Sequence, residues 1–75
     1  MAHKSSTGEA AGRVWKQLSK SGEISVASLT KSVQLPRATV DRALGWLDKE
    51  QKINWNSKGN IDVVALTEEE LNAIQ

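Results

Sequence analysis

Cysteine is absent from this chain of 75 residues, and histidine occurs once. Without cysteine there is no disulfide and no thiolate metal site, and the single His3 has no second imidazole with which to bind zinc. The glycines stand singly, so none forms a phosphate-binding loop. We therefore expect no catalytic residues, no cofactor, no metal and no small-molecule substrate, and we expect His3 to be a solvated residue.

Long apolar runs are also missing. No segment approaches the length of a membrane span, and the first eight residues lack the apolar stretch of a signal peptide. A chain of this length with 39% hydrophobic residues allows one domain with one modest core. We expect a small soluble protein in the cytoplasm, with no membrane partner.

Net charge is small, because ten basic residues face nine acidic ones. A domain dedicated to DNA is usually more basic, which weighs against a nucleic-acid partner. The acids are unevenly placed, however: residues 1–66 hold six of them against all ten bases, and three glutamates follow directly at 68–70.

Apolar spacing predicts two helices in the first half of the chain, after a flexible tail at residues 1–5. Ser6 and Glu9 match a capping box at the start of the first helix, and Gly22 suits its end. Ile24 anchors a short extended segment, and Ser25 caps a second helix from Val26 to Val33. The inward residues of these helices recur at helical spacing: Ala11, Val14, Trp15, Leu18, Val26, Leu29 and Val33.

The second half predicts a longer helix and a hairpin. Pro36 suits the first turn of a helix from Pro36 to about Gln51, whose inward stripe is Val40, Ala43, Leu44 and Leu47. Strands follow at 52–56 and 61–66, joined by a turn at 57–60. We expect Ile53, Trp55, Ile61 and Val63 to be packed inward. Thr67 and Glu70 repeat the capping box before a last short helix.

This order of elements predicts a mostly helical α+β fold of the winged helix-turn-helix type. Its three-helix core and two-stranded wing hairpin would occupy residues 6–66, and the short C-terminal helix residues 67–75.

Three segments carry a family resemblance. The run Leu35-Pro36-Arg37-Ala38-Thr39-Val40-Asp41-Arg42-Ala43-Leu44 resembles the recognition helix of MarR-type regulators. Residues 12–18 and 43–53 are similar to a family of small bacterial winged-helix proteins of unassigned function. The MarR-type pattern usually has a glycine where Gln51 stands, and a longer, more basic wing than this one, in which Lys58 is the only charge of the turn.

The sequence of the third helix predicts which residues would contact a nucleic acid. In a helix-turn-helix protein the early exposed residues of this helix meet base edges in the major groove. Arg37 and Arg42 would bind guanine or phosphate, and Thr39 a base edge or backbone oxygen. Lys49 and Lys58 complete the predicted set. The alternative is a surface ion pair between Arg37 and Asp41, with Arg42 simply solvated.

A protein interface is the second hypothesis, with a homodimer as its simplest form. Gly45 weakens a helix interior and suggests close approach of another backbone, while the neighbouring Trp46 either anchors a partner or covers the edge of the core. Val64 and Leu66 point opposite to Ile61 and Val63, so both faces of the last strand are apolar. In one arrangement the last helix folds back and covers Val64 and Leu66 with its apolar residues Leu71 and Ile74. In the other, these four residues meet the same patch of a second chain and form a two-fold dimer.

Overall fold

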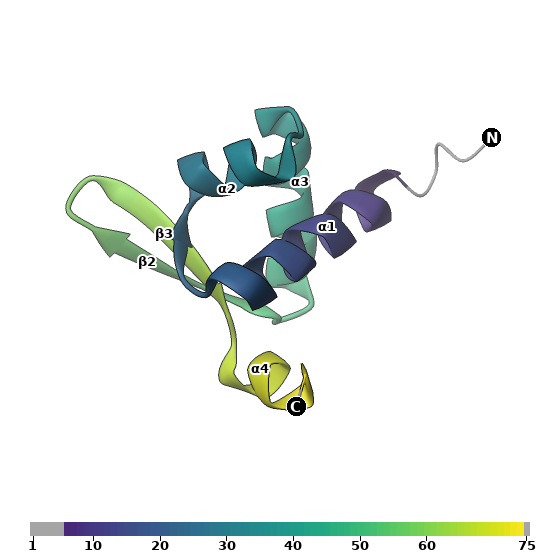
Figure 1. The fold of residues 1–75 in the computed structure, drawn as a ribbon, viewed down its shortest axis with the longest axis vertical. Helices are drawn as coiled ribbons and strands as arrows, with labels where there is room; N and C mark the ends of the chain where they lie inside the picture. The colour runs from purple at the N-terminus through teal and green to yellow at the C-terminus, as the bar shows by residue number, and fades with distance from the viewer. Residues whose placement is uncertain (1–5, 75) are drawn as a thin grey trace.

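Within residues 6–74, four helices and three short strands follow one another in the order that the sequence predicts (Figure 1). The computed structural model describes residues 6–74, and the side chains of residues 8–73. The elements are α1 (Ser6–Ser21), β1 (Ile24–Ser25), α2 (Val26–Val33), α3 (Arg37–Lys49), β2 (Ile53–Lys58), β3 (Ile61–Leu66) and α4 (Glu68–Ile74). The tail at 1–5 with His3, and the side chains of Ser6 and Ile74, lie outside the described residues.

Local signals set the helix ends. The hydroxyl of Ser25 accepts the amide of Ser28 at 3.1 Å and caps α2, as predicted. Gly22, with a φ of 71°, ends α1 and donates its amide to the carbonyl of Leu18 at 3.0 Å. Thr67 accepts the amide of Glu70 at 3.3 Å and caps α4. Pro36 stands just before α3, which ends at Lys49, two residues earlier than expected.

The sheet has three strands, because the short segment at Ile24 joins the hairpin. β3 lies in the middle and pairs antiparallel with β1 on one side and β2 on the other. Ile24 stands opposite Val64, and Ile53 opposite Leu66. Directly opposed residues share a face of the sheet, so these four side chains form the layer that packs against the helices.

This register corrects the predicted faces of β3. Val64 and Leu66, expected outside, are 1% and 4% exposed and belong to the core, while Ile61, expected inside, is 56% exposed. Val63 is buried as predicted, but on the other face, between Ser25 and Asn56 of the neighbouring strands. Both alternating sets are apolar, so alternation alone could not decide which set the helices cover.

The helical stripes build the rest of the core as predicted. Val14 and Leu18 of α1, Leu29 of α2, and Val40 and Leu44 of α3 are all buried in one cluster. No helix in residues 6–74 is both long and apolar enough to cross a membrane.

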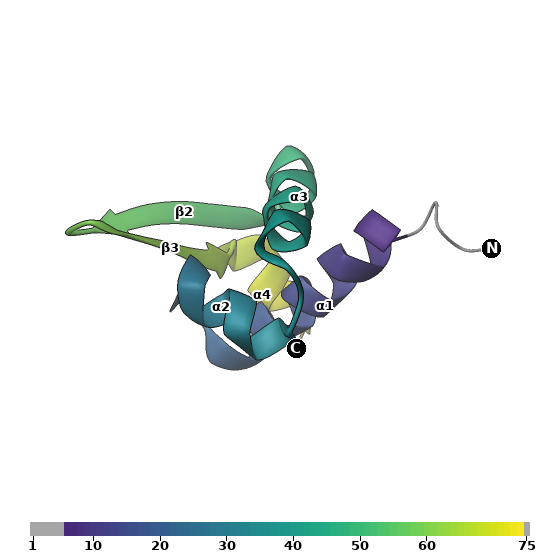
Figure 2. The ribbon, with the colours of Figure 1, turned by 90° about the horizontal axis from the view of Figure 1, so that it is seen from above.

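The hairpin reaches past the helices, as Figures 1 and 2 show from two directions. Trp55 shares the inner face with Ile53 but sits where helical cover runs out, so it is 47% exposed rather than packed. Its indole nitrogen donates to Asp48 of α3 at 3.3 Å. The wing is therefore fixed to α3 by a polar contact at its base.

The last helix is held to Trp15 of α1 and to Lys52, which precedes β2, and not over the outer face of β3 as one of the two expected arrangements required. The Glu70 carboxylate accepts the indole N–H of Trp15 at 2.9 Å and lies 3.7 Å from the Lys52 ammonium. Leu71 stays 39% exposed. The sheet surface proposed for this helix or for a second chain was Val64 and Leu66, and both are already buried in the main core of the chain.

Candidate nucleic-acid interface

The outward face of α3 is a narrow stripe of four residues. Val40, Ala43, Leu44 and Leu47 are buried on one side of this helix. At about 100° per residue, the positions opposite them are Ala38, Arg42, Gly45 and Lys49, and all four are exposed. We call these four residues the α3 stripe.

Two cations and two small residues alternate along the α3 stripe. Among residues 8–73, neither Arg42 nor Lys49 forms an ion pair. A Cβ built on Gly45 would meet nothing within 4 Å, so no contact inside the chain requires glycine there. The stripe thus offers two available cations on a helix whose backbone can be approached closely.

The other predicted cations are engaged in surface ion pairs. Arg37 binds Asp41 at 2.9 Å, with the two side chains 61% and 57% exposed, so the sequence alternative of an Arg37–Asp41 pair is confirmed. Lys58 at the end of β2 binds Glu23, which precedes β1, at 2.7 Å. Exposed pairs of this kind contribute only about 0–1 kcal/mol, so a phosphate could replace the carboxylate in either.

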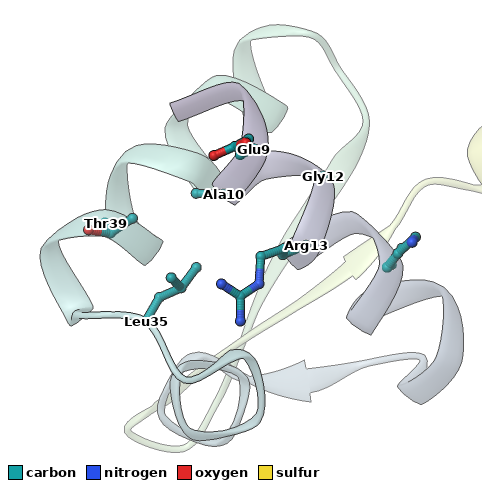
Figure 3. A pocket seen from close by; sticks show the side chains of 7 residues that line it. Glu9, Ala10, Gly12, Arg13, Leu35 and Thr39 are labelled. Atoms are coloured by element: carbon teal, nitrogen blue, oxygen red, sulfur yellow. The ribbon is translucent and has the colours of Figure 1, made fainter. Parts of the chain in front are cut away.

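Thr39 is half-buried and turns toward α1 instead of outward. It lines a groove of about 620 Å³ with Glu9, Ala10, Gly12, Arg13, Lys16 and Leu35, most of which Figure 3 labels. A base edge in contact with the α3 stripe would meet Thr39 only at the margin of the interface.

Sequence reasoning missed the role of Arg13 in this groove. Its guanidinium donates to the carbonyl of Val33 at 2.7 Å and so satisfies the last turn of α2. The partner lies twenty residues further along the chain, and no local pattern signals such a contact.

The side of α3 that faces the wing is acidic. Asp48 accepts the Trp55 indole N–H there, and Asp41 lies on the same side of the helix, about 100° around from Arg42. These carboxylates would repel a phosphate backbone. On α3, favourable contact with an anion therefore falls to the α3 stripe and to Arg37 at the start of the helix, with Lys58 on the wing as a further cation.

Trp46 lies on the opposite flank, toward α1. It is 50% exposed and lines a shallow depression together with Gly8, Gly12 and Trp15. The indole thus borders the core and still presents half of its surface to solvent.

A three-helix core, an exposed third helix and a projecting hairpin define a winged helix-turn-helix domain. The chain belongs to the family described as Winged helix-turn-helix domain (DUF2582), whose model matches residues 1–66. This confirms the fold and the resemblance predicted from the sequence. No curated protein in the comparison matches the chain significantly.

Solved structures share the fold. A Bacteroides thetaiotaomicron protein solved by NMR is 30% identical, with 84% of this chain and 77% of that chain covered and a TM-score of 0.77. The Zalpha domain of Carassius auratus PKZ, in complex with Z-DNA, is 18% identical over 81% of this chain and 97% of its own, with a TM-score of 0.71.

A homodimeric winged helix-turn-helix DNA-binding domain from Mycobacterium bovis is 17% identical, with 95% of this chain and 69% of that chain covered and a TM-score of 0.72. At these identities the Zalpha and M. bovis structures show a common fold and nothing finer.

Proposed function

We propose that this protein is a non-enzymatic, regulator-like module that binds duplex DNA through the α3 stripe. The observation that carries the proposal is the pair of exposed cations, Arg42 and Lys49, on one outward face of the third helix, neither of which forms an ion pair within residues 8–73. Such a role needs a compartment that holds DNA, which agrees with the cytoplasmic location expected from the sequence.

Each residue of the stripe has a chemical part in this proposal. The planar guanidinium of Arg42 can bind guanine O6 and N7 or a phosphate with two parallel hydrogen bonds, while Lys49 acts as a point charge on the backbone. Ala38 and Gly45 have little or no side chain, so this face of α3 is narrow beside Arg42 and Lys49. The helix can therefore enter a major groove about 12 Å wide.

The paired cations extend the contact at its ends. Arg37 lies at the start of α3 and Lys58 near the tip of the wing, and each can exchange its carboxylate partner for a phosphate. Two of the solved structures with this fold are DNA-binding domains by their descriptions, which supports the same use of the scaffold here.

A titration with random-sequence duplex at several salt concentrations tests the proposal. Two to four phosphate contacts predict weak binding whose logarithmic salt slope lies between about −2 and −4. Arg42→Ala and Lys49→Ala should each weaken binding and flatten the slope by about one.

Lys20→Ala, which removes an exposed cation from α1, is the matched control and should leave the slope unchanged. The absence of duplex binding even at low salt would refute the proposal.

A module used only for protein interaction is the second candidate. The carboxylates Asp41 and Asp48 beside the wing, and the half-exposed Trp46, favour it. In that case the Arg42 and Lys49 variants would bind their partners as tightly as the wild type. Substitutions at Trp46 would weaken the binding of a partner protein.

A further inference from the structure

A half-exposed tryptophan stands beside two helical glycines for which the fold gives no reason. Trp46 of α3 and Gly8 and Gly12 of α1 line the same shallow depression, together with Trp15, Lys52 and Glu70. We call these six residues the Trp46 patch. Leu71, 39% exposed on α4, follows Glu70 directly.

The glycines weaken α1 and gain nothing inside the chain. A Cβ built on Gly8 or Gly12 meets no atom within 4 Å, and neither residue has the positive φ that favours glycine at Gly22. Alanine would therefore fit at both positions and would strengthen the helix. Glycine leaves the helix backbone uncovered beside the exposed indole of Trp46. Within residues 8–73 nothing uses this uncovered backbone, so it is available to a group that approaches from outside.

We propose that the Trp46 patch binds the same patch of a second copy of this chain. A two-fold contact requires a surface that complements itself. This patch carries a projecting indole and a bare hollow side by side, so each copy can place Trp46 over the glycine backbone of the other. Tryptophan is the residue type most favoured as such an anchor.

The charges of the patch fit a second copy as well. Lys52 and Glu70 lie 3.7 Å apart and balance each other. Across a two-fold axis, each Lys52 can face the partner's Glu70, so that two identical surfaces meet without like-charge repulsion. The neighbouring groove, which shares Gly12 with the patch, differs, because Arg13 and Lys16 outnumber Glu9 there and would repel a copy of themselves.

This contact leaves the α3 stripe free. Trp46 projects about 100° around the helix from Gly45, which lies on the stripe. Dimer formation is therefore independent of the proposed DNA binding, and each can fail without the other.

Sedimentation velocity of the full chain over a wide concentration range tests the proposal. The wild type should shift from monomer to dimer as its concentration rises. Gly12→Leu adds bulk to the hollow and should weaken the dimer at least tenfold. The monomer should melt no lower than the wild type, because a Cβ at this position meets nothing within 4 Å. Trp46→Gln removes the anchor and should weaken the dimer similarly.

Gly45→Leu is the matched control, since it makes the same change at another exposed helical glycine and should leave the dimer constant within twofold. Circular dichroism checks that each variant is folded. If one of the variants Gly12→Leu and Trp46→Gln is unfolded, the other alone tests the proposal. A wild type that stays monomeric at every concentration overturns the proposal. So does a dimer that both variants leave intact.

Discussion

Two glutamines hold backbone conformations that usually belong to glycine. Gln34 ends α2 with a φ of 57°, and Gln51 links α3 to β2 with a φ of 60°. The MarR-type pattern places a glycine at the second of these positions. This sequence has Gln51 at that position, yet the backbone keeps the left-handed conformation. A residue with a side chain in this conformation costs roughly 1–2 kcal/mol relative to glycine.

Gln51→Gly should therefore stabilise the domain by about 0.5–1 kcal/mol, after the extra chain entropy of glycine is deducted. Urea unfolding measures this, and Gln51→Ala, which keeps a Cβ in the same turn, should show no such gain. A glycine variant less stable than the alanine variant would contradict this account of the turn.

The helices could be predicted from the sequence, and the sheet only in part. Stripes at helical spacing, the caps Ser25 and Thr67, and Gly22 mark the helical segments closely. On β3, Val63 and Val64 are both buried, on opposite faces, so alternation gave no way to choose the inner one. Contacts between distant segments, such as Arg13 with Val33, leave no local signal.

The candidate nucleic-acid interface was only half predictable. Arg42 and Lys49 stand on the predicted exposed face, while Arg37, Thr39 and Lys58 have partners or orientations that depend on the tertiary fold. Helical spacing places a residue on a face, but it cannot show which neighbouring element has come close to it.

Helix α3 should be the element on which the core depends most. Leu44 is 1% exposed within the main cluster, and Leu44→Ala should cost about 2–5 kcal/mol, which is a large share of the stability of so small a domain. Thermal unfolding measures the loss, with Leu71→Ala on the exposed side of α4 as a mild comparison. A Leu44→Ala variant that melts within a degree or two of the wild type would contradict the packing described for α3.

Helix α4 has seven residues and is too short to persist alone. Its attachment is the Trp15–Glu70 hydrogen bond, so Trp15→Phe should cost about 1 kcal/mol and expose the α4 amides to rapid hydrogen exchange.

Trp55→Phe removes the other indole hydrogen bond, which holds the wing, and should leave α4 protected. Equal protection of α4 in both variants would show that other contacts hold this helix.

At the scale of the whole molecule, the sign of the charge varies with the face. The net charge is only +1, yet Arg42 and Lys49 lie together on the outward face of α3, and the three glutamates lie together on α4. A polyanion therefore has a favourable approach along α3, in spite of the nearly neutral total. Local arrangement, more than net charge, decides whether this domain can bind DNA.

An NMR titration of the labelled protein with a short duplex tests this central claim most directly. We expect the amide shifts to change along α3, strongest at Ala38, Arg42, Gly45 and Lys49, with smaller changes at the wing near Lys58 and none in α4. Added salt should reverse them. Shifts confined to α1 or α4, or no shifts at low salt, would contradict the assignment of the α3 stripe as the nucleic-acid interface.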